Sequence, residues 1–187
     1  MRKVVWSLFG IFVVAAFVAT GTSWANKMHG EKVKVKLAAV PSVKTSAGGE
    51  ADFALAKDGK TIHFRLDLKK IENVTMAHVH AVGADGTPAA ILTWLYPPGG
   101  DKPSLREGKL SGKLSEGDIT DANLLGPMKG KAVKELFEQI KNGTAGVAVH
   151  TKQNGGGELW GIHKEAKKES KNEMNLDEPV GTGSLGY

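Results

Sequence analysis

The chain has 187 residues, a formal net charge of +5 and no cysteine. This length allows one domain with extensions, and the lack of cysteine excludes disulfides, cysteine-based zinc fingers and cysteine nucleophiles. The positive charge is mild and dispersed, so no nucleic-acid partner is predicted.

The first 25 residues have the layout of a secretory signal peptide. Arg2 and Lys3 form a short positive segment, and residues 4–19 are almost wholly apolar. Ser23 and Ala25 place small residues at the two positions that signal peptidase reads. An uncleaved N-terminal anchor is the alternative. The protein is therefore predicted to be exported, either periplasmic or secreted, and to meet a membrane only through the signal peptide before cleavage.

Residues 26–32 are predicted to be a flexible lead-in, residues 33–164 a folded domain and residues 165–187 a disordered, charged and glycine-rich tail. Alternation of apolar and polar residues predicts the first three strands of the domain, which are residues 33–37, 51–55 and 62–68. The later elements are strands at 73–82, 89–96 and 109–114, a helical turn at 119–125, a helix at 131–141, and strands at 145–151 and 158–164. Short strands separated by turn signals predict a mostly β fold. We expect an antiparallel Greek-key β-sandwich or barrel with one inserted helix near 131–141.

The histidines form the most informative chemical pattern. His78 and His80 are two residues apart in a predicted strand, so their side chains share one face. His150 points away from the apolar face of its own predicted strand. If the two strands are neighbours, three imidazoles converge on the outer face of the sandwich. His63 and His163 are candidate auxiliary ligands.

Three or four imidazoles suit copper or zinc. The alternative is that the histidines are surface residues with no metal. Glu158, next to a run of three glycines, is expected to be a solvent-facing strand residue.

Two ordered stretches of the sequence resemble the CHRD domain, named from chordin. Residues 73–80 (NVTMAHVH) are followed by Gly83 and by Asp85-Gly86, and residues 149–151 and 157–161 match the second half of the family in order. The resemblance covers about residues 33–164. It implies an all-β, often exported domain whose biochemical activity is poorly defined, and it maps the family histidines onto His78, His80 and His150.

A fainter similarity is to copper-zinc superoxide dismutase. The segment from His78 to Asp85 resembles the copper-ligand strand of that enzyme, and residues 155–162 resemble its last strand. The resemblance implies an immunoglobulin- or superoxide dismutase-like sandwich. The dismutase disulfide is impossible in this chain, and no further histidine lies between His80 and His150 to build the zinc subsite.

Three functions follow from these patterns. The first is a non-enzymatic extracytoplasmic module with a histidine-based copper or zinc site. The second is a module that binds an envelope protein or a polysaccharide through its surface or its loops at 97–105 and 153–157, with structural histidines. The third is a dismutase-like copper enzyme.

Overall fold

The computed structural model describes residues 30–164. The described chain has seven strands, and their bounds in chain order are β1 (Lys32–Ala39), β2 (Gly48–Leu55), β3 (Ile62–Val82), β4 (Pro88–Tyr96), β5 (Arg106–Ile119), β6 (Ala145–Thr151) and β7 (Leu159–Ile162). Between β5 and β6 lie two short 3-10 helices, η1 (Asp121–Asn123) and η2 (Gly126–Met128), and one α-helix, α2 (Val133–Lys141). This order confirms the prediction of a mostly β fold with one inserted helix.

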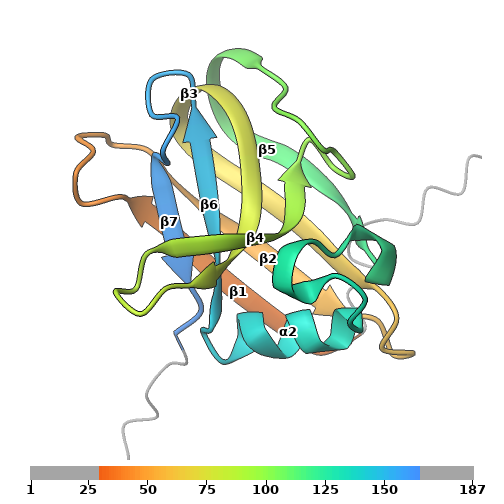
Figure 1. Cartoon of the computed structure of the whole chain (residues 1–187). Coiled ribbons are helices and arrows are strands. Elements are labelled where there is room, and N and C mark those ends of the chain that lie inside the picture. The colour runs from red at the N-terminus through yellow and green to blue at the C-terminus, as the bar shows by residue number, and fades with distance from the viewer. Residues whose placement is uncertain (1–29, 165–187) are drawn as a thin grey trace, which may run out of the picture.

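The strands form a closed antiparallel barrel (Figure 1). They follow the order β2-β1-β7-β6-β3-β4, and a further pairing of β2 with β3 closes β2, β1, β7, β6 and β3 into a ring. The strands β4 and β5 each pair with β3 beside this ring. The seam between β1 and β7 is the shortest in the ring, since only Ala38 with Trp160 and Ala39 with Leu159 are paired there. Closure gives β2 a partner on each side, so its edge is not left open.

The strand β3 corrects the sequence-based assignment. Two strands were predicted at 62–68 and 73–82, whereas the structure has one strand of 21 residues. The chain turns within it at Lys70 and Asn73, both of which have positive φ, and the side chain of Asn73 accepts a hydrogen bond from the backbone N–H of Gly108 at 2.9 Å. The residues before this bend pair with β2 and the residues after it pair with β6, so one strand serves two parts of the barrel.

The barrel interior is filled by alternate residues of the strands, including the fully buried Phe53, Phe64, Leu66 and Val79. One face of α2 closes one end of the barrel (Figure 1), because its apolar residues Val133, Leu136, Phe137 and Ile140 are all buried. The helix begins at Val133, where the carboxylate of Asp121 accepts a hydrogen bond from the first free backbone N–H at 2.7 Å. The helical turn predicted at 119–125 corresponds to the 3-10 helix η1, which supplies this cap.

The predicted signal peptide and the predicted C-terminal tail lie outside the described residues. Within residues 30–164, no helix is long and apolar enough to cross a membrane.

Barrel closure depends on close approach of two backbones at Gly161. A Cβ atom at this position would lie 2.0 Å from the carbonyl oxygen of Lys36, so Gly161→Ala must push β7 away from β1. We expect this substitution to lower the free energy of unfolding by about 1–3 kcal/mol in urea denaturation. Gly155→Ala is the matched control, since a Cβ there meets no atom within 4 Å. Equal stability of the two variants would contradict this account of the seam.

Candidate metal centre

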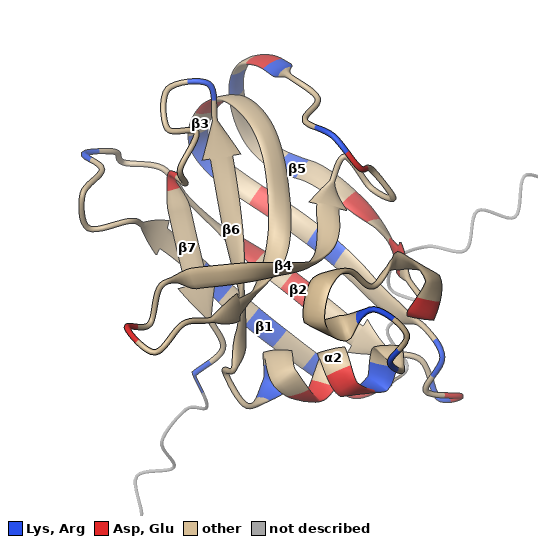
Figure 2. Cartoon of the chain, viewed as in Figure 1, with Lys and Arg blue, Asp and Glu red and all other residues tan. Residues whose placement is uncertain are grey.

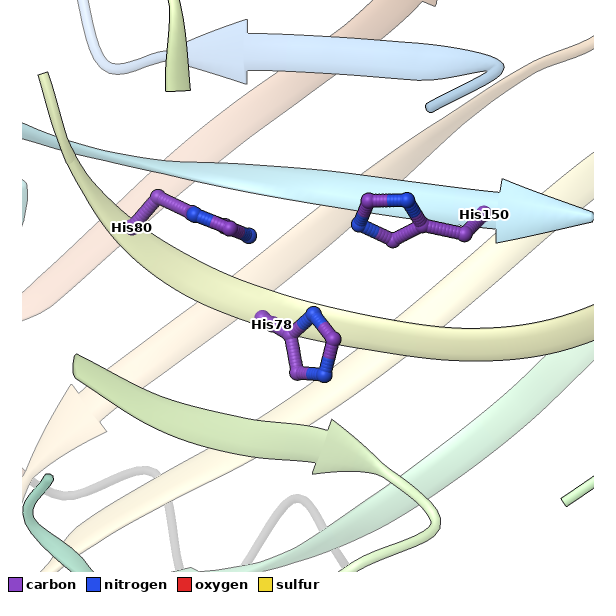
Figure 3. Close-up of side chains that lie close together, drawn as sticks. All are labelled: His78, His80 and His150. Atoms are coloured by element: carbon purple, nitrogen blue, oxygen red, sulfur yellow. The ribbon is translucent and has the colours of Figure 1, made fainter. Parts of the chain in front are cut away.

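Two neighbouring strands bring three histidines together. In the β3–β6 pair, Val79 lies opposite Val147 and His78 lies opposite Ala148. Residues two apart on a strand share a face, so His80 joins His78 on β3 while His150 joins Ala148 on β6. The small side chain of Ala148 leaves space between the imidazoles, and Figure 3 shows the three rings gathered in front of the two strands.

The three imidazoles are close enough to share one ion. One nitrogen from each ring forms a group in which all atoms lie within 4.8 Å of one another. The ring centroids are 5.4 Å apart for His78 and His80, 5.3 Å for His78 and His150, and 6.1 Å for His80 and His150. The convergence of the three histidines depended on their strands being neighbours, and the structure pairs β3 with β6.

Backbone carbonyls fix the tautomers of two of the rings. Nδ1 of His80 lies 2.8 Å from the carbonyl oxygen of Ala89, and Nδ1 of His150 lies 3.0 Å from that of Gly155. A carbonyl oxygen only accepts, so each Nδ1 carries the proton and donates it, and each Nε2 keeps a lone pair. In metal sites, histidine ligands are commonly oriented in this way by a hydrogen bond from the ring nitrogen that does not bind the metal.

The remaining ring nitrogens have no hydrogen-bond partner within residues 30–164. They are Nε2 of His80, Nε2 of His150 and both nitrogens of His78, and all of them are buried. Most buried polar atoms in native proteins are hydrogen-bonded, so four such atoms in one cluster require an explanation. A metal ion that accepts one lone pair from each ring would account for three of them, while the second nitrogen of neutral His78 carries its proton.

The histidines are buried, which corrects the expectation that they lie on a solvent-facing surface. His78 is 1% exposed, His80 6% and His150 7%.

Trp94 on β4 lies opposite His78, and the two rings meet edge to face with centroids 4.1 Å apart. The ring centroids of Trp160, on β7, and His80 are 6.3 Å apart. The indole N–H of Trp160 donates a hydrogen bond to the carbonyl oxygen of Gly86 at 3.0 Å. The two tryptophans thus cover a face that strand alternation alone assigns to solvent.

Burial keeps the cluster uncharged. Desolvation, together with the smaller effect of the nearby rings of His150 and His80, lowers the pKa of His78 to about 3. Desolvation also lowers the pKa of His80 and of His150, against the opposing effect of their hydrogen bonds to backbone carbonyls. Neutral imidazole is the form that binds metal ions.

The two predicted auxiliary histidines lie elsewhere. Nδ1 of His63 is 2.7 Å from a carboxylate oxygen of Asp118, and Nδ1 of His163 is 2.9 Å from the carbonyl oxygen of Lys34. Neither belongs to the group of converging nitrogens. The structure therefore brings together three of the five histidines predicted for the site.

Glu158 is 7% exposed, which corrects the expectation of a solvent-facing strand residue. Its carboxylate accepts hydrogen bonds from Thr45 at 2.9 Å, Thr151 at 2.8 Å and Asn154 at 2.9 Å. These bonds tie the β6–β7 turn to the loop after β1. The turn carries the carbonyl of Gly155, so Glu158 helps to hold the group that orients His150.

Comparison with known proteins gives one match. A family model described as the CHRD domain matches residues 27–162, which include all ten elements of the barrel. No curated protein and no solved structure matches the chain.

The buried, neutral histidines predict that the metal-free protein loses stability in mild acid. The unfolded chain binds protons at these residues near the ordinary pKa of 6.5, whereas the folded chain binds them only at lower pH. The unfolded state therefore holds more protons as pH falls below about 6.5, and the free energy of unfolding decreases. His78 alone contributes up to about 1.4 kcal/mol per pH unit between its two pKa values. Urea denaturation between about pH 7.5 and about pH 4.5 measures the effect.

His78→Leu is the matched variant for this measurement. Leucine has a similar volume and replaces two buried nitrogens that have no hydrogen-bond partner. We expect a shallower loss of stability in acid, and a metal-free protein about 1 kcal/mol more stable near neutral pH. An unchanged pH dependence would show that His78 does not titrate as its burial requires.

Proposed function

The chain belongs to the CHRD-domain family, and from that premise we propose that it is a non-enzymatic extracytoplasmic module that binds one copper or zinc ion. His78, His80 and His150 are the proposed ligands. The observation that carries the proposal is the cluster of buried ring nitrogens without hydrogen-bond partners. Export rests on the signal peptide pattern in the first 25 residues.

The energetics of the metal-free cluster support a ligand role over a packing role. Each buried polar atom left without a partner costs about 1–3 kcal/mol. An apolar side chain of the same size would remove that cost, so three adjacent histidines are a poor solution for packing alone. Metal binding converts the unused lone pairs into bonds, and the carbonyls of Ala89 and Gly155 already hold two of the rings in the required tautomer.

The dismutase-like alternative has less support. Redox turnover at copper requires an open position that substrate can reach, and the ligand histidines are between 1% and 7% exposed. Within residues 30–164, the three histidines are the one group of three or more His, Asp or Glu side chains that could hold a metal ion. No second cluster is therefore present there for a zinc subsite. A binding role fits the covered site better than turnover does.

The proposal predicts one tightly bound metal ion per chain. We expect the purified protein to take up about one equivalent of copper or zinc, and the variant with His78→Ala and His80→Ala to lose at least about a hundredfold in affinity. Elemental analysis and competitive titration measure both. The matched control carries His63→Ala and His163→Ala, two histidines outside the cluster, and should bind as wild type does. Wild-type protein without affinity for either metal would overturn the proposal.

A second candidate function rests on a surface groove. An open groove of about 840 Å³ runs along β1 and β7, and its lining includes Trp160, Lys36 and Lys164 but no Asp or Glu among the described residues. Lys34 also lines it but forms ion pairs with Glu50 and Asp52. An aromatic ring beside cationic side chains suits a polysaccharide that carries negative charge.

This second proposal predicts binding to an anionic polysaccharide. We expect the protein to bind alginate but not neutral dextran in calorimetric titration, and binding to weaken as salt screens the lysines. Charge reversal by Lys36→Glu with Lys164→Glu should abolish it. Lys57→Glu with Lys60→Glu makes the same change of net charge in the exposed β2–β3 turn, and should leave binding intact. Equal loss in both variants would assign the effect to net charge and contradict a specific groove.

A further inference from the structure

We propose that Met76 provides a fourth, thioether ligand to the histidine cluster and that the site is built for Cu(I). The inference rests on the proposed metal-binding function and specifies which ion that site takes. Two independent observations support it. One is the position of Met76 in the barrel, and the other is the absence of charged residues from the strands that form the site.

The strand register puts Met76 on the face that carries the histidines. Met76 precedes His78 by two residues on β3, so the two side chains project from the same side of the strand. Across the β3–β6 pair, Met76 lies directly opposite His150. Directly opposed residues on one face have Cβ atoms about 4.5–5.5 Å apart. Met76 therefore adjoins both a ligand of its own strand and a ligand of the neighbouring strand.

Methionine has the reach and the chemistry for this position. Its unbranched side chain has three rotatable bonds and adapts to irregular space. Met76 is half-buried in the structure. The other methionine within residues 30–164 is Met128, which is buried next to α2, and its sulfur accepts a hydrogen bond from Gln139 at 3.2 Å. Thioether sulfur is a soft ligand that favours Cu(I) over harder divalent ions.

The charge around the cluster supports the same ion. The segments that surround the histidines are residues 73–82 of β3 together with β4, β6 and β7, and they contain no Asp, Glu, Lys or Arg. Figure 2 shows these strands free of both charge colours, whereas β1, β2 and β5 carry many charged residues. No carboxylate joins the three histidines in the group of converging ligand atoms within the described part of the chain. All proposed ligands are therefore neutral.

A buried site with only neutral ligands favours a low ionic charge. The cost of moving an ion out of water rises with the square of its charge, so a divalent ion costs about four times as much as a monovalent ion of the same size. Divalent ions in buried sites usually gain an anionic ligand or a bound hydroxide that offsets this cost. The rings of Trp94 and Trp160 cover the cluster and restrict water, and this cover further favours Cu(I).

The test uses the whole purified protein and three metals. Cu(I) is titrated without oxygen against the chelator bicinchoninate, and Cu(II) and Zn(II) are titrated against their own competitors. We expect Met76→Leu to lower the affinity for Cu(I) at least about tenfold and to change the affinity for Zn(II) by less than about twofold. X-ray absorption of the Cu(I) protein should show a sulfur neighbour that disappears in Met76→Leu. Met128→Leu makes the same chemical change away from the cluster and should match wild type in every readout.

The outcomes separate this inference from the proposed function. A Cu(I) protein without a sulfur neighbour, or a Met76→Leu variant with unchanged affinity for Cu(I), overturns the role of Met76. Tighter binding of Zn(II) than of Cu(I) overturns the assignment to Cu(I) while leaving a metal site at the histidines. Wild-type protein that binds none of the three metals overturns the proposed function itself. Circular dichroism of each variant confirms that lost binding does not arise from lost folding.

Discussion

The antiparallel pairing of β3 with β6 is the constraint on which the site and the barrel both depend. In this register Val79 faces Val147 inside the barrel, and the same alternation sends His78, His80 and His150 to the other face. A slip of one residue would exchange the two faces, placing imidazoles in the apolar core and valines in the cluster. The apolar core therefore fixes the register, and the register brings the histidines together. Fold stability and site geometry are linked through one set of backbone hydrogen bonds.

The bend in β3 makes this pairing compatible with a closed barrel. Positive φ values at Lys70 and Asn73 let one strand pair with β2 before the bend and with β6 after it. The strands β4, β6 and β7, which surround the second part of β3, carry no charged residues. The charged positions lie on β1, β2, β5 and the first part of β3 (Figure 2). One half of the barrel thus has a solvated, charged surface. The other half has tryptophan side chains that cover three uncharged imidazoles.

The covered cluster is an unfavourable feature of the metal-free protein. Four buried ring nitrogens have no hydrogen-bond partner in the described chain, although the rest of the neighbourhood is well satisfied. Glu158, for example, accepts three hydrogen bonds around the turn that holds His150. Local instability of this kind is characteristic of sites that are organised in advance for a ligand, because the cost is borne by the surrounding fold. We infer that binding, rather than packing, explains why these positions are histidines.

The sequence by itself determined the strand-rich fold, the inserted helix, the shared face of His78 and His80 and the family, because alternation, turn residues and short ordered motifs are local properties of the chain. That the strand of His150 lies beside this strand was decided by the tertiary structure. The sequence divided β3 into two strands, since the pattern is interrupted at residues 69–73 and backbone continuity through a positive-φ bend has no local signature. It also placed the histidines in solvent. Whether Trp94 and Trp160 cover that face depends on β4 and β7 packing beside β3 and β6, and only the tertiary structure decides which distant side chains meet. For the same reason, the sequence did not identify Met76 as a candidate ligand. Its position opposite His150 exists only once the two strands are paired.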